Sequence, residues 1–173
     1  MYPIKFVIGG CRSGKSKYAL IHANTHWQPP KCFLATSEPL DHEMQTRIVN
    51  HQKERGQDWH TIECPINIYE KLLNESHQYS GMLLDCVTLW INNLMCRDMD
   101  EISIKNQIAQ FLESLKKIKC PIIIVSNEVG LGIVPENAMA RLYRDLVGYA
   151  NQQIAGISDD VVYMVAGIPM IIK

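Results

Sequence analysis

The sequence contains no apolar run that approaches the roughly 20 residues of a membrane-spanning helix. Its first residues, Met1 to Lys5, also lack the charged-then-apolar order of a secretory signal, and the short apolar stretch there runs straight into a glycine pair. We therefore expect a protein that has no membrane span and works in the cytoplasm.

The chain also lacks an excess of charge of either sign. Its 17 Lys and Arg residues are offset by 18 Asp and Glu residues, which gives a formal net charge of −1. Proteins that bind nucleic acid non-specifically need a surplus of positive charge, so we expect no nucleic-acid partner. A local basic pocket for one phosphorylated ligand is still compatible with this balance.

Closely spaced cysteines are missing as well. None of the six lies two or three residues from another, so the sequence gives no support for a zinc site. A chain of 173 residues is large enough to fold without disulfides, and we expect reduced thiols. The six are Cys11, Cys32, Cys64, Cys86, Cys96 and Cys120.

Internal repeats, low-complexity segments and linkers are also absent, so residues 1–173 are expected to form a single domain. Apolar runs alternate with stretches of helical spacing. The sequence predicts strands at residues 3–8, 32–35, 61–62, 81–86, 121–125, 161–165 and 170–172. It predicts helices at residues 16–24, 41–55, from 67 onward, 102–118 and 137–155.

This alternation predicts an α/β fold, in which a mainly parallel sheet carries helices on both faces. The last two strands lie too close together in the chain for a helical crossover, so we expect a C-terminal antiparallel hairpin. Residues 127–137 form the one long irregular connection, and such loops are often functional.

The clearest motif is a phosphate-binding loop. It reads Gly9-Gly10-Cys11-Arg12-Ser13-Gly14-Lys15-Ser16 and fits the pattern G-x-x-x-x-G-K-[ST]. Glycines let several backbone N–H groups point into one cavity, Lys15 can reach the β- and γ-phosphates, and the Ser16 hydroxyl can ligate Mg²⁺. A chance glycine-rich turn is the alternative. The expected strand before the motif and helix after it favour a nucleoside-triphosphate enzyme.

A carboxylate at the end of another buried strand would complete such a site. Asp85 follows Met82, Leu83 and Leu84 and fits the role of holding Mg²⁺, directly or through water. The alternative is that Asp85 caps a helix, a role that Thr88 could also fill. The phosphate loop makes us favour the metal role.

A histidine lies within a stripe of charged residues. Glu43, Arg47, His51 and Arg55 recur every four positions and would share one face of a helix. A solvated face is the ordinary interpretation of such a stripe. However, it becomes basic toward its C-terminal end, which suits a phosphate partner, and imidazole is the side chain best able to act as a neutral nucleophile near pH 7. From the residues alone, both interpretations stay open.

A second glycine-rich segment, Ser126 to Gly132, follows an expected strand. Its glycines allow the close approach of a ligand, or simply tight turning. Arg141 and Arg144 lie on the helix expected next. They could stabilise a transferring phosphate, or they could pair with Glu136 and Asp145.

Taken together, these motifs resemble one family over almost the whole chain: the bifunctional adenosylcobinamide kinase/adenosylcobinamide-phosphate guanylyltransferase of cobalamin biosynthesis. The longest matching run covers residues 126–152. The matching segments are GGCRSGKS at 9–16, ATS at 35–37, DHEM at 41–44, RIVNH at 47–51, WHTIE at 59–63, LLDCVT at 83–88, SNEVGLGIVPEN at 126–137 and RLYRDLVGYANQ at 141–152.

The resemblance implies a phosphate-loop α/β fold similar to that of RecA, and a homotrimer. It implies that adenosylcobinamide, a corrinoid, is phosphorylated with ATP or GTP. GMP is then transferred from GTP to that phosphate, which gives adenosylcobinamide-GDP and pyrophosphate. In the family, this second step runs through a GMP-histidine intermediate.

The family's nucleophilic histidine falls on His51. Three departures from the usual pattern are Cys11 where Ala is common, His42 in a usually acidic run, and differences in detail at residues 52–55. Beyond the phosphate loop, the resemblance implies nucleotide contacts at Ala35, Thr36, Ser37, Gln52, Lys53, Glu54, Arg55, Glu63 and Asp85.

Two other functions fit a phosphate loop. A plain small-molecule kinase would form no covalent GMP adduct. A GTP-dependent regulatory protein usually reads guanine with an N-K-x-D-type segment after a strand, and Ser126-Asn127-Glu128-Val129 does not match that pattern.

Overall fold

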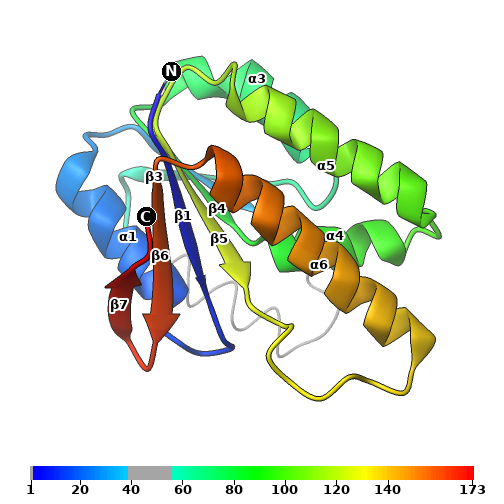
Figure 1. Ribbon diagram of the computed structural model, residues 1–173. Coiled ribbons are helices and arrows are strands. Elements are labelled where there is room, and N and C mark those ends of the chain that lie inside the picture. Colours follow the sequence, from blue (N-terminus) through cyan, green and yellow to red (C-terminus); the bar gives the residue numbers. More distant parts are fainter. Residues whose placement is uncertain (1, 39–55) are drawn as a thin grey trace.

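The computed structural model describes residues 2–38 and 56–173. Its centre is a 7-stranded sheet in the order β3-β2-β4-β5-β1-β6-β7 (Figure 1). All neighbouring strands are parallel except β6 and β7, which form the expected C-terminal hairpin. The strands are β1 (Ile4–Gly9), β2 (Lys31–Ala35), β3 (Trp59–Glu63), β4 (Met82–Asp85), β5 (Ile122–Asn127), β6 (Asp160–Val165) and β7 (Ile168–Ile171).

Helices cover both faces of this sheet. In the described part of the chain, α1 lies on one face, and α3, α4, α5 and α6 lie on the other (Figure 1). The helices are α1 (Lys15–His26), α3 (Ile68–Glu75), α4 (Val87–Met95), α5 (Glu101–Leu115) and α6 (Ala138–Ile157), with a short 3₁₀ turn at η1 (Ser76–Gln78).

The central strands are buried on both faces, which explains their unbroken apolar sequences. In β5, Ile122 and Ile124 belong to the core under α3 to α6, whereas Ile123 and Val125 belong to the core under α1. Successive side chains of a strand point to opposite faces, so a strand covered on both sides needs apolar residues at every position. The parallel sheet that the sequence predicts is therefore confirmed.

One helix was not expected from the sequence. In α4, six of nine residues are buried, among them Trp90, Ile91 and Leu94. The helix is short, and some of its polar residues, such as Asn93, are themselves buried, so its sequence does not have the solvent-facing polar side typical of a surface helix. Cys86 is its N-cap and makes no side-chain capping bond, so the capping role considered for Asp85 and Thr88 is wrong.

The remaining expectations have mixed outcomes. The expected helix at residues 41–55 lies wholly outside the described residues. All six cysteines, each of them described, are free thiols, as expected. The long irregular connection follows β5 and ends where α6 begins. In the described ranges, no helix is both long and apolar enough to cross a bilayer.

Candidate functional site

The candidate site lies at the carboxyl edge of the sheet, where the parallel strands end together. Ala35 at the end of β2 lies between Glu63 of β3 and Asp85 of β4. On the other side of β4, β5 separates Asp85 from the phosphate loop, and Asn127 at its end pairs with Gly9. Ligands of open α/β sheets bind at this edge.

The β6–β7 hairpin packs against the phosphate loop. The backbone N–H of Gly167 donates to the Ser13 carbonyl at 3.0 Å. A Cβ on Gly9 would lie 2.4 Å from the Met164 carbonyl oxygen, so no larger residue fits there without a shift. Gly14 has a φ of 92°, in the left-handed region that glycine tolerates best. Packing therefore requires glycine at position 9, and backbone geometry favours it at position 14.

A matched pair of substitutions tests this packing. Gly9→Ala is expected to lower the free energy of unfolding by roughly 1–3 kcal/mol, because its methyl group would overlap the Met164 carbonyl. A Cβ on Gly10 meets nothing within 4 Å, so Gly10→Ala should change stability far less. Urea unfolding of both variants measures the difference. Equal destabilisation of the two would show that the hairpin does not confine the loop.

Lys15 is the first residue of α1, and its side chain is buried within the site. Its Nζ donates to the Gly10 carbonyl at 2.6 Å. Burial lowers the pKa of Lys15, and the nearby carboxylate of Asp85 opposes that shift. The N-cap of α1, Gly14, makes no side-chain capping bond. The positive end of the helix and the lysine therefore face the same loop, which is the arrangement that binds phosphate.

Thr36 locks the ends of β2 and β4 together. Its hydroxyl donates to the Cys86 carbonyl and accepts from the Cys86 N–H, both at 2.7 Å. Its carbonyl accepts a bond from the Asn93 side chain at 2.7 Å. Because Thr36 is fully buried, its side chain positions the ends of the strands and does not face a ligand. Ala35 and Ser37 flank it at the sheet edge.

The residues expected to hold Mg²⁺ are Ser16, in the first turn of α1, and Asp85, at the end of β4. In the described ranges, no three His, Cys, Asp or Glu side chains are grouped so that they could hold a metal ion by themselves. Mg²⁺ does not need such a group, because it is commonly bound by one or two protein oxygens together with phosphates and waters. A hydroxyl and a carboxylate fit that chemistry.

The end of β5 belongs to the site, whereas the sequence leaves both a ligand role and simple tight turning open for Ser126 to Gly132. The Glu128 N–H donates to the Gly9 carbonyl at 2.9 Å. The Asn127 side chain donates to the Thr88 hydroxyl at 2.9 Å, and the Asn127 carbonyl accepts from Asn151 of α6 at 3.1 Å. In the sequence, the signal for a site here is that polar residues directly follow a buried strand. They tie the phosphate loop to both α4 and α6.

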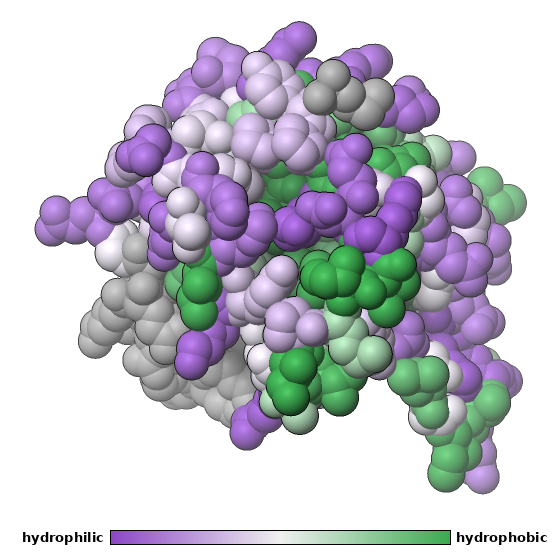
Figure 2. All heavy atoms as spheres, turned by 60° about the vertical axis from the view of Figure 1, so that its left-hand side comes forward, coloured by the Kyte–Doolittle hydropathy of each residue, from purple (hydrophilic) through white to green (hydrophobic). Residues whose placement is uncertain are grey.

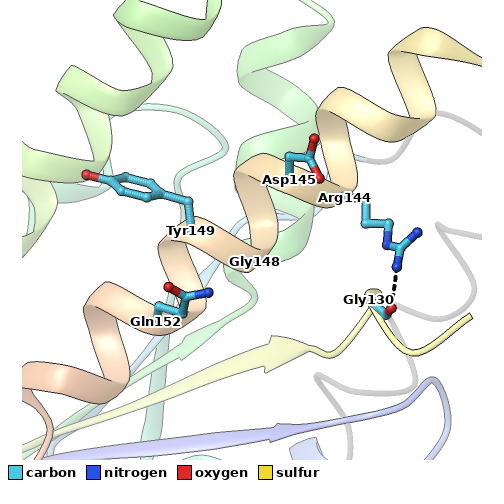
Figure 3. Close-up of a pocket in the computed structure, with 6 residues that line it drawn as sticks. All are labelled: Gly130, Arg144, Asp145, Gly148, Tyr149 and Gln152. Carbon is cyan, nitrogen blue, oxygen red and sulfur yellow. Dashed lines mark hydrogen bonds between the residues drawn. The ribbon is translucent and has the colours of Figure 1, made fainter. Parts of the chain in front are cut away.

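Arg141 and Arg144 hold the loop between β5 and α6. Arg144 donates to the Gly130 carbonyl at 2.6 Å, as Figure 3 shows. Arg141 donates to the carbonyls of Pro135 and Glu136 at 3.0 and 2.6 Å. Both guanidinium groups therefore bond the backbone, rather than the carboxylates of Glu136 and Asp145 considered from the sequence.

Part of the predicted site cannot be placed. His51, the expected nucleophile, lies outside the described residues, as do the expected nucleotide contacts Gln52, Lys53, Glu54 and Arg55. The structure does bring together, at one edge, the other expected positions: the phosphate loop, residues 35–37, Glu63 and Asp85.

Comparison with known protein families gives one match over nearly the whole chain. The family model described as cobinamide kinase / cobinamide phosphate guanyltransferase matches residues 5–172. The chain is 37% identical over 167 residues to the bifunctional adenosylcobalamin biosynthesis protein CobP of Pseudomonas aeruginosa, covering 96% of this chain and 95% of the relative. It is 35% identical over 179 residues to the corresponding CobU protein of Salmonella typhimurium, covering 96% and 98%.

Solved structures with lower sequence identity share the fold. The flagellar accessory protein FlaH of Methanocaldococcus jannaschii matches with a TM-score of 0.51 at 14% identity, over 99% of this chain and 78% of that one. A solved ATPase domain also matches with a TM-score of 0.51, at 9% identity, over 93% and 68%. These similarities confirm the expected α/β fold, a mainly parallel sheet with helices on both faces.

Proposed function

Because the chain belongs to the cobinamide kinase/cobinamide phosphate guanyltransferase family, we propose that it carries out both reactions of a bifunctional enzyme. It phosphorylates adenosylcobinamide with ATP or GTP and then converts the phosphate to adenosylcobinamide-GDP. The observation that carries this proposal is the family match over residues 5–172. In the same chain, the phosphate loop, Lys15 and Asp85 meet at one sheet edge.

In the kinase step, the oxygen of the corrinoid hydroxyl attacks the γ-phosphorus and its proton is released to solvent. The bond from the γ-phosphorus to the bridging oxygen breaks, and the nucleoside diphosphate leaves with the electron pair. Such a transfer needs mainly positioning and charge neutralisation. The loop N–H groups and Lys15 hold the phosphates, and Ser16 and Asp85 would hold Mg²⁺. When bound, Mg²⁺ neutralises charge that develops on the phosphate oxygens.

In the guanylyl transfer, an imidazole nitrogen of His51 attacks the α-phosphorus of GTP. The bond to the bridging oxygen breaks, and pyrophosphate leaves with the electron pair. An oxygen of the adenosylcobinamide phosphate then attacks the same phosphorus and breaks the phosphorus–nitrogen bond, which regenerates His51. Two steps of this kind replace one more difficult displacement.

A product assay tests the proposed function directly. The protein is incubated with adenosylcobinamide, ATP, GTP and Mg²⁺, and the corrinoids are separated and identified by mass. We expect adenosylcobinamide phosphate first and adenosylcobinamide-GDP later. Accumulation of the phosphate alone would favour a plain kinase, and unchanged adenosylcobinamide would contradict both activities.

We include a homotrimer and a cytoplasmic location in the proposal. The support for both is the resemblance to the family. Sedimentation at several protein concentrations is expected to give a single trimeric species, and a monomer that still carries both activities would contradict the first.

A further inference from the structure

Helix α6 and the turn at Gly130 surround a pocket of about 360 Å³ beside the site. Five of its lining residues come from α6, and Gly130 closes one end (Figure 3). The lining residues are Gly130, Arg144, Asp145, Gly148, Tyr149 and Gln152. None of the expected nucleotide contacts among the described residues lines this pocket, which leaves it available for a second ligand.

The lining favours a neutral, polar ligand. Arg144 and Asp145 carry opposite formal charges, and the Arg144 guanidinium already donates to the Gly130 carbonyl. Within the described residues, no hydrogen bond engages the side chains of Asp145 or Gln152 or the Tyr149 hydroxyl. Together these groups can accept hydrogen bonds from primary amides and donate to them.

An exposed apolar patch lies on the loop that begins at the pocket and on the first turn of α6. We define the apolar patch as Leu131, Ile133, Val134 and Met139, which are 81%, 97%, 63% and 70% exposed. Figure 2 shows hydrophobic surface at its lower right, where the loop between β5 and α6 protrudes. Exposed apolar groups gathered in this way mark a binding surface.

The same loop is anchored to the phosphate loop. Glu128, at its start, donates its N–H to the Gly9 carbonyl at 2.9 Å, and Gly130 follows two residues later. At the other end, Arg141 of α6 bonds the carbonyls of Pro135 and Glu136. A ligand seated between α6 and this loop therefore borders the place where the phosphates are expected.

We propose that the pocket and the apolar patch together bind one edge of the corrinoid substrate. This inference rests on the proposed function. The rim of a corrinoid carries primary amide side chains, which match Asp145, Tyr149 and Gln152, and its methyl-bearing ring matches the apolar patch. The pocket is too small for the whole macrocycle, so it receives amide side chains while the ring lies against the loop.

Substitutions at exposed positions test this assignment. The double variant Asp145→Ala/Gln152→Ala is expected to raise KM for adenosylcobinamide and for its phosphate roughly tenfold, because two sets of hydrogen bonds are lost. Ile133→Ser, on the loop, is expected to raise the same constants. Gln153→Ala is the matched control, since Gln153 is exposed on α6 but does not line the pocket.

A second measurement separates this inference from the proposed function. Wild type and variants are incubated with GTP and Mg²⁺ alone, and the GMP-sized mass gain of the protein is measured. We expect the same gain in all of them. Corrinoid KM values that match wild type would overturn the assignment. The assignment would also be overturned if a variant with a raised KM no longer sedimented as an oligomer, because the substituted surface would then be a contact between subunits. Absence of both corrinoid products in wild type would instead overturn the proposed function.

Discussion

A His51→Ala variant is expected to lose guanylyl transfer by at least roughly 10³-fold while phosphorylation of adenosylcobinamide stays within about twofold of wild type. The reason is that, in the proposed mechanism, only the second reaction forms a bond to the imidazole. The kinase step relies on the phosphate loop and Lys15, which the substitution leaves in place. Separate assays of adenosylcobinamide phosphate and adenosylcobinamide-GDP measure the two rates.

The matched control is His42→Ala, which removes the other imidazole of the same segment. We expect it to retain both activities. Equal loss of both activities in His51→Ala, with an unchanged unfolding temperature, would show that His51 serves nucleotide binding rather than bond formation. Loss of guanylyl transfer in His42→Ala alone would move the nucleophile to His42.

A Lys15→Met variant is expected to lose both activities, each by roughly 10²- to 10³-fold. Methionine has a similar volume but cannot stabilise the phosphate oxygens in either transition state. GTP should also no longer raise the unfolding temperature. Product assays and thermal unfolding with and without GTP measure these effects. Loss of only one activity would show that the two reactions do not share one phosphate site.

The same variant has a predicted effect on the unliganded protein. Burial lowers the pKa of Lys15 below its ordinary value of 10.5, so the unfolded chain binds more protons between the two pKa values. Below the lowered pKa, Lys15 is charged in both states, and its burial lowers the free energy of unfolding by the full amount. This loss of stability becomes smaller as the pH rises above the lowered pKa. Lys15→Met should therefore unfold at an unchanged or higher temperature at neutral pH. Its stability should rise less steeply than that of wild type toward alkaline pH. Marked destabilisation would mean that the bond to Gly10 outweighs desolvation.

Most of the fold could be predicted because the central strands are buried on both faces. The apolar runs Met82 to Leu84 and Ile122 to Val125 can be recognised from the sequence, because short unbroken apolar runs between turns are typical of strands buried on both faces. Helix α4 could not be found in the same way. It has only 9 residues, and polar residues such as Asn93 are buried within it, so its sequence resembles a strand or a loop as much as a helix.

Some parts of the site could be predicted from the sequence, and others could not. The phosphate loop could be predicted because its chemistry requires glycines, a lysine and a hydroxyl at fixed spacing. The roles of Thr36 and Asn127 could not, because each depends on a partner distant in sequence: Cys86 for the first and Thr88 for the second. Such contacts arise only once the sheet order is known. The choice of His51 as nucleophile still rests on the resemblance.

The covalent intermediate is the central claim, and intact-protein mass spectrometry after incubation with GTP and Mg²⁺ tests it most directly. Wild type is predicted to gain one GMP-sized mass that acid removes, because a phosphorus–nitrogen bond to histidine is acid-labile, and His51→Ala is predicted to show no gain. A gain that survives in His51→Ala would contradict the assigned nucleophile. No gain in either protein, with GTP binding demonstrated, would contradict the guanylyl-transfer mechanism itself.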